Sequence, residues 1–189
     1  MNIALFGGVF DPPHIGHQTI AQALLDQCIA DQVWFVPVGL HPFGKKFSVV
    51  EDKDHRLEML ELILTENMKI ERFELEHMGI SYSYRTLEVL AKQYPEHNFS
   101  WVIGSDNLAK FDQWQEFEQL LQKFRVYVYP RRDFAMKPWY DGMVEIVDVE
   151  PVEVSSTMIR DRVRDGKSIK GLVSSAVDNY ITMNILYVA

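Results

Sequence analysis

The chain has 189 residues, of which 47% are hydrophobic, 12% aromatic and 24% charged, a composition that supports a folded core and argues against intrinsic disorder. The formal net charge of -8 argues against a general nucleic-acid binder, which needs a basic surface, but allows a local cationic pocket for small anions. Because the N-terminal apolar run is too short for a signal peptide and no stretch approaches ~20 apolar residues, we expect a cytoplasmic protein without a membrane partner.

Short apolar runs rich in strand-forming residues alternate with longer amphipathic stretches. Strands are expected at residues 3–6, 33–38, 69–75, 98–103, 125–129 and 144–149. Helices are expected at residues 14–29, 56–64, 83–94, 114–122, 156–163 and 173–181, with Gly166 as the cap of the fifth. This alternation predicts an α/β fold, a Rossmann-like doubly wound parallel sheet in one domain of residues 1–189, with a helical C-terminal part from about residue 155.

The single cysteine, Cys28, excludes an internal disulfide. It stands beside Leu24, Leu25 and Ile29 in the first expected helix. We expect an inert thiol in the core there rather than a nucleophile.

The segment that follows the first expected strand, GGVFDPPHIGH at residues 7–17, is suited to binding a phosphate. Gly7 and Gly8 let the backbone approach a ligand closely. His14 and His17 stand three residues apart at a helix start, so they point the same way where free N–H groups and the helix dipole favour an anion. A metal half-site and two incidental surface histidines are the alternatives.

A second segment, SSTMIR at residues 155–160, has the character of a helix start. Serine is a favoured N-cap residue, and hydroxyl and N–H groups at a helix start can cradle an anion. Arg160 lies on the first turn, where its planar guanidinium can reach a polyphosphate. The alternative is a capped surface helix with a solvated basic stripe.

Between these segments, the expected fourth strand ends in Gly104-Ser105-Asp106. An aspartate at this place can accept hydrogen bonds from ribose hydroxyls, as in other nucleotide sites. A plain helix N-cap is the alternative for Asp106.

Four strings together resemble the bacterial nicotinate-nucleotide adenylyltransferases, a family of nucleotidylyltransferases with the HIGH motif. GGVFDPPHIGH is similar to the family's GG-[TS]-F-D-P-x-H-x-G-H, with Val9 in place of the hydroxyl residue. SSTMIR is similar to [ST]-[ST]-T-x-[IL]-R, and GSDNLAKFDQW to G-[AS]-D-x-[LM]-x-x-[FL]-x-x-W. ISYSYRTL resembles P-S-Y-T-x-[DE]-T-[LI], with Arg85 in place of the acid.

The resemblance implies roles for particular residues. Those expected to bind ATP are Gly7, Gly8, Val9, Phe10, Gly104, Asp106, Ser155, Ser156, Thr157 and Arg160. Those expected to act in catalysis are His14, His17, Arg160 and Lys45 or Lys46, the lysines lying in a loop longer than the family's usual one. Those expected to hold the acceptor are Asp11, Ser83, Trp114 and Arg131, with the Trp114 indole stacked on a pyridine ring. No metal-ligating residue is expected, because Mg²⁺ should arrive with ATP.

The reaction implied is adenylyl transfer from ATP to nicotinate mononucleotide, giving deamido-NAD and pyrophosphate in NAD biosynthesis. Nicotinamide mononucleotide and phosphopantetheine are alternative acceptors, and cytidylyl transfer is a further alternative. A non-catalytic nucleotide sensor is the alternative from another class. A tRNA synthetase is disfavoured because the chain is short and acidic. The oligomeric state stays open, with a homodimer as one option.

Overall fold

The computed structural model describes residues 1–40, 42, 52–77, 79–151 and 153–188. Its centre is a six-stranded sheet of order β3-β2-β1-β4-β5-β6, in which every neighbouring pair is parallel. The strands are β1 (Asn2–Gly8), β2 (Gln32–Pro37), β3 (Met68–Ile70), β4 (Asn98–Gly104), β5 (Arg125–Tyr129) and β6 (Met143–Glu145). The predicted doubly wound parallel sheet is confirmed.

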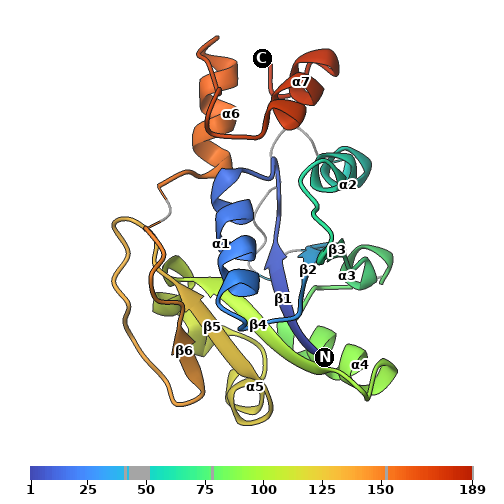
Figure 1. Ribbon diagram of the computed structural model, residues 1–189, viewed down its shortest axis with the longest axis vertical. Helices are drawn as coiled ribbons and strands as arrows, with labels where there is room; N and C mark the ends of the chain where they lie inside the picture. Colours follow the sequence, from blue (N-terminus) through green and yellow to red (C-terminus); the bar gives the residue numbers. More distant parts are fainter. Residues whose placement is uncertain (41, 43–51, 78, 152, 189) are drawn as a thin grey trace.

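Helices cover both faces of this sheet (Figure 1). They are α1 (Ile15–Asp26), α2 (Lys53–Glu61), α3 (Phe73–Glu76), α4 (Ser83–Gln93), the 3₁₀ helix η1 (Ser105–Gln113), α5 (Phe117–Lys123), α6 (Ser156–Arg164) and α7 (Ser175–Met183). In the described part of the chain, no helix combines the length and apolar character needed to cross a membrane.

Strand side chains alternate between two buried clusters, as the two-residue period of a strand requires. In β1, Ala4 and Phe6 belong to a cluster that also holds residues of α1, α2, α6 and α7. Ile3 and Leu5 belong to a second cluster, with residues of α4, η1 and α5. Both faces of the sheet are therefore covered, which explains why the strands read as continuous apolar runs.

Helices α1, α6 and α7 end in the same hydrogen-bonded cap, and this cap corrects the expectation for Cys28. Helix α1 ends at Asp26, and Cys28 follows in the left-handed region with φ 53°. The N–H groups of Cys28 and Ile29 donate to Leu25 and Leu24 at 3.0 Å, which is a Schellman motif. The thiol is consequently exposed, not in the core. Gly166 occupies the same position after α6, as predicted.

Other differences from the expected elements also have local causes. The strand expected at residues 69–75 is only three residues long, because the Glu71 carboxylate accepts from the Phe73 N–H at 3.0 Å and starts α3. The helix expected at residues 114–122 begins at Phe117, after Glu116 with φ 57°. Trp114 therefore ends η1 instead of opening α5. The sixth strand covers residues 143–145, not 144–149.

Candidate active site

The first loop leaves β1 at the carboxyl edge of the sheet and enters α1 (Figure 1). A Cβ on Gly7 would lie 2.4 Å from a ring atom of Trp101, so the strand can pass this indole only as glycine. Phe10 has φ 52°, and its ring is buried against Phe6, Phe35 and His17. Phe10 thus holds the loop on the core, and only its backbone is placed to meet a ligand.

The two histidines of this loop stack on each other, with ring centroids 3.6 Å apart and planes 21° from parallel. The main-chain N–H of His14 donates to the ring Nδ1 of His17 at 3.1 Å. A ring nitrogen that accepts carries no hydrogen, so the hydrogen of a neutral His17 is on Nε2. His14 is 2% exposed, and its Nδ1 has no hydrogen-bond partner among the described residues.

Burial keeps both rings uncharged. It lowers the pKa of His14 to about 3, with a further contribution from the Arg131 guanidinium. Burial also lowers the pKa of His17 well below its usual value, and the repulsion that a protonated His14 and Arg131 would exert on a charged His17 lowers this pKa further. At neutral pH the pair therefore offers neutral imidazole N–H groups, which can donate to a phosphate oxygen.

Arg131 follows β5 and brings a permanent positive charge to the histidine pair. Its Nε lies 3.7 Å from Oδ1 of Asp106, and its guanidinium donates to the Val154 carbonyl at 3.4 Å. A Cβ on Gly104 would lie 2.4 Å from Asp106 Oδ1 and 2.7 Å from Arg131 Cδ, so glycine is required where these groups pack. The structure thus brings Gly104, Asp106 and Arg131 together with the histidines.

The start of α6 docks on the first loop, although the two segments are far apart in sequence. Ser156 Oγ donates to the Pro12 carbonyl at 2.8 Å, and Arg160 donates to the Asp11 carbonyl at 2.7 Å. Arg160 also donates to Thr157 Oγ1 at 3.2 Å, while Ser155 caps the helix by accepting from Met158 at 3.2 Å. The two expected phosphate segments are therefore in direct contact.

Not every group expected to bind a ligand is available to one. The Ile15 N–H at the start of α1 donates to the Leu172 carbonyl at 3.0 Å. The Asp11 side chain is 1% exposed and accepts from the Tyr187 hydroxyl at 2.6 Å. This location favours a structural role for the Asp11 carboxylate, and the expected acceptor contact stays a prediction.

Two other residues expected to hold the acceptor lie on the opposite face of the sheet from α6. Ser83 begins α4, and Trp114 packs its ring on Phe111 with centroids 5.1 Å apart. Among the residues that the structure describes, no hydrogen bond or ring contact joins Ser83 or Trp114 to the histidine pair. Lys45 and Lys46 lie outside the described residues.

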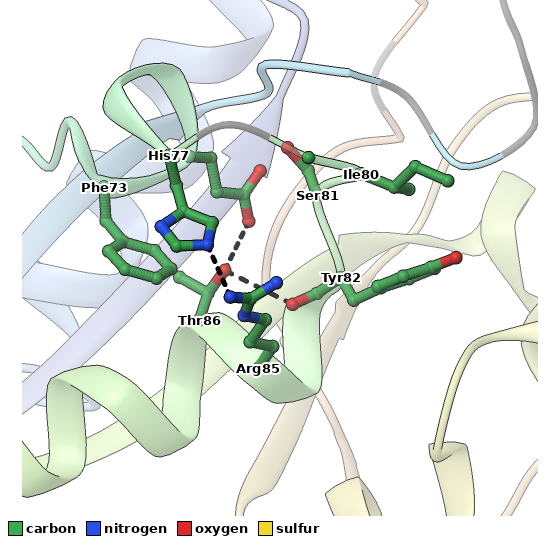
Figure 2. A pocket seen from close by; sticks show the side chains of 9 residues that line it. Phe73, His77, Ile80, Ser81, Tyr82, Arg85 and Thr86 are labelled. Carbon is green, nitrogen blue, oxygen red and sulfur yellow. Dashed lines mark hydrogen bonds between the residues drawn. The ribbon is translucent and has the colours of Figure 1, made fainter.

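A small pocket lies beside the acceptor segment, between α3 and the start of α4 (Figure 2). Arg85 turns toward His77, whereas the Tyr82 ring points away from both. Glu74 borders the pocket, is 6% exposed, and accepts from Thr86 Oγ1 at 2.7 Å. Burial raises the pKa of Glu74 to about 7.

Sequence reasoning missed three residues that support the site: Arg56, Glu74 and Tyr187. Arg56 is 3% exposed and donates to the Val9 and Val38 carbonyls at 2.9 and 3.0 Å, joining the first loop to the end of β2. A signal existed for Arg56, since it precedes buried Met59, Leu60 and Ile63 at the spacing of an apolar helix face. Nothing in the local pattern marked the other two.

Among the described residues, no group of three or more His, Cys, Asp or Glu side chains is placed to hold a metal ion.

Comparison with known proteins gives a consistent result. Residues 5–162 match the cytidylyltransferase-like family. The chain is 35% identical over 187 residues to the nicotinate-nucleotide adenylyltransferase of Bacillus subtilis and to the probable nicotinate-nucleotide adenylyltransferase of Bacillus licheniformis, covering 98% of this chain and 97% of each relative. The fold is similar to that of the Plasmodium falciparum nicotinic acid mononucleotide adenylyltransferase complexed with NaAD, with a TM-score of 0.81, 19% identity and coverage of 98% and 97% of the two chains.

Proposed function

Because this chain belongs to the cytidylyltransferase-like family and, within it, to the nicotinate-nucleotide adenylyltransferases, we propose that it transfers the adenylyl group of ATP to nicotinate mononucleotide. The products are nicotinate adenine dinucleotide and pyrophosphate. The observation that carries this proposal is the contact between the first loop and the start of α6, where Ser156 and Arg160 donate to the carbonyls of Pro12 and Asp11.

The reaction is a displacement at the α-phosphorus of ATP. A phosphate oxygen of the acceptor forms the new P–O bond, the bond between the α-phosphorus and the bridging oxygen breaks, and pyrophosphate leaves with the electron pair. The attacking phosphate is already ionised at neutral pH, so the step needs no general base. Positioning and charge stabilisation then supply the rate enhancement.

The histidine pair and Arg131 are suited to the α-phosphate. Nε2–H of His17 and a ring N–H of His14 would donate to its oxygens, whose charge grows in the transition state. Arg131 lies beside both rings and supplies the positive charge that the neutral imidazoles lack. This division of roles explains how a buried histidine and a half-buried one, both neutral, can serve an anionic site.

Arg160 and the start of α6 are suited to the departing pyrophosphate. The guanidinium is already held by the Asp11 carbonyl and Thr157 Oγ1 at 2.7 and 3.2 Å, so little rotamer freedom is lost when a phosphate binds. We also assign Gly7, Gly8 and Asp106 to the ATP site, following the resemblance of their segments to the family's motifs. A lysine of the 45–46 pair is assigned to bridge the phosphates.

Ser83 and Trp114 are the residues we assign to the acceptor, with Arg131 contacting its phosphate. The indole of Trp114 is partly buried on Phe111, which would leave it one face for a pyridine ring. Nucleotidyltransferases use a divalent metal with ATP, and we propose Mg²⁺, held mainly by phosphate oxygens and water, to offset phosphate charge. We also propose a cytoplasmic location for the reaction.

The test is pyrophosphate release from ATP and Mg²⁺ with three acceptors offered separately. Nicotinate mononucleotide should give the highest kcat/KM. Preference for nicotinamide mononucleotide or phosphopantetheine would keep the chemistry but overturn the acceptor. ATP binding without release in any of the three assays would instead indicate a nucleotide sensor.

A further inference from the structure

The last turn of the chain reaches the first loop through one buried hydroxyl. Tyr187 is 3% exposed, and its O–H donates to Oδ1 of Asp11 at 2.6 Å across 176 positions of sequence. Tyr187 also has φ 63°, a conformation that costs a non-glycine residue energy and persists only where contacts impose it. The segment after α7, residues 184–188 and called the tail below, is thus held in place by its contacts.

A helix cap directs the tail to this place. After α7, the N–H groups of Ile185 and Leu186 donate to the carbonyls of Thr182 and Ile181 at 3.3 and 3.0 Å, and Ile185 has φ 53°. This Schellman cap reverses the chain. Leu186 then enters the core cluster shared with α1 and α6, and Tyr187 follows into the same cluster.

Asp11 connects this tail to the cationic part of the site. Its carboxylate accepts from Tyr187, while its main-chain carbonyl accepts from Arg160 at 2.7 Å. The buried Arg56 guanidinium is attracted by Asp11 and donates to the carbonyl of neighbouring Val9 at 2.9 Å. A displacement of Asp11 would therefore move both the first loop and the anchor of Arg160.

We propose that Tyr187 is a positioning residue for the pyrophosphate subsite, acting through Asp11 on Arg160 and the first loop. The inference rests on the proposed adenylyl transfer for the identity of that subsite. Tyr187 touches no reactant, because its hydroxyl is buried against Asp11. Replacing Tyr187 should consequently change ATP affinity and turnover and leave the KM of the acceptor unchanged.

The first test compares Tyr187→Phe with Tyr180→Phe. Both changes remove one hydroxyl from the C-terminal part, but the Tyr180 hydroxyl contacts His55 Nδ1 at 2.6 Å, on α2. Losing a hydrogen bond to a buried carboxylate should raise the Kd of ATP by calorimetry, and its KM, about tenfold in Tyr187→Phe. The acceptor KM should stay within about twofold, as should every constant of Tyr180→Phe.

A second measurement separates positioning from general loosening of the fold. Hydrogen exchange should speed up in residues 9–14 of Tyr187→Phe and stay unchanged in β1 and β4. In a double-mutant cycle, Tyr187→Phe should add little to the ATP affinity loss of Asp11→Ala, because both remove the same contact. Should Tyr187→Phe fail to fold, Asp11→Asn, which keeps the size of the side chain but removes the charge that the Tyr187 hydroxyl contacts, is expected to raise the Kd of ATP measured in the absence of acceptor.

Three results would overturn the inference: an unchanged ATP affinity, equal losses for ATP and acceptor, or independent effects in the cycle. Failure of the proposed function gives a different pattern. In that case the wild-type protein would bind ATP without turnover, and the ratio of ATP dissociation constants between wild type and Tyr187→Phe would still decide the role of Tyr187.

Discussion

In the proposed active site, a phosphate would meet two stacked histidines that are neutral, and their desolvation explains why they remain neutral. His14 and His17 lie 3.6 Å apart by ring centroid, so two positive charges there would repel strongly as well as lose hydration. Their N–H groups can still donate to developing negative charge, and the fixed positive charges come from Arg131 and Arg160. The sequence predicted an anion site here. It did not predict that the histidines would be neutral donors and that the arginines would supply the positive charge.

Replacing His17 tests the donor role directly. His17→Ala should lower kcat by about 10²- to 10³-fold, the usual cost of removing a transition-state hydrogen-bond donor. Circular dichroism should show an intact fold. The control is Gln22→Ala on the same helix, because the Gln22 side chain hydrogen-bonds only to exposed Asp26 within the described part of the chain. A near-normal rate for His17→Ala, or an unfolded variant, would count against the assignment.

The raised pKa of Glu74 predicts how the free energy of unfolding depends on pH. Its folded pKa of about 7 lies above the ordinary 4.5, so the stability linked to its protonated form is full below about pH 4.5 and is lost as pH rises through about 7. Glutamine cannot ionise. As pH rises from 4.5 to 8, the wild type should lose up to about 3 kcal/mol of unfolding free energy that Glu74→Gln keeps, so the variant becomes more stable relative to the wild type by that amount.

Urea denaturation of both proteins at each pH measures this difference. Contributions from other titrating groups, such as the acid destabilisation expected from His14, are common to both proteins and cancel. A pH-independent difference between Glu74→Gln and the wild type would show that Glu74 titrates normally.

At the scale of elements, hydrophobic periodicity predicted the strands and helices, and local hydrogen bonds set their ends. Cys28 and Ile185 show the limit of this reasoning. Both take the left-handed position of a helix cap with φ 53°, where glycine is the usual signal. Without that signal, α1 was expected to continue to Ile29, and the exposed Cys28 was expected in the core.

Arg56 links α2 to two loops at the carboxyl edge, and its loss should be costly. Arg56→Met removes hydrogen bonds to the Val9 and Val38 carbonyls and takes away a positive charge that attracts Asp11. We expect the free energy of unfolding to fall by about 3–5 kcal/mol, the usual effect of breaking a buried charge pair.

The control for Arg56 is Arg72→Met, at an ion pair whose two side chains are 50% and 53% exposed. Exposed pairs contribute little, so this change should cost less than about 1 kcal/mol. Chemical denaturation compares the two variants. Similar small losses at both positions would mean that Arg56 does not join the loops.

At the scale of the whole molecule, the parallel sheet and the edge that carries the site followed from the alternation of strands and helices. The contacts that complete the site could not be predicted in this way. Ser156 meets Pro12 across 144 positions and Tyr187 meets Asp11 across 176. Such pairs depend on how the C-terminal helices pack on α1, which no local pattern specifies.

The acceptor is the least determined part of the site from sequence. Ser83 and Trp114 come from different elements on the face opposite α6, and the Lys45–Lys46 segment lies outside the described residues. Their assignment to the acceptor stays a prediction.

The group that is transferred is the most direct test of the account. ATP labelled at the α-phosphorus should be incubated with Mg²⁺, nicotinate mononucleotide and the enzyme, and the products separated by chromatography. We predict that the label enters the dinucleotide, with one pyrophosphate released for each dinucleotide formed. Label retained in ADP or AMP without dinucleotide, or a γ-phosphate moved to the acceptor, would contradict adenylyl transfer.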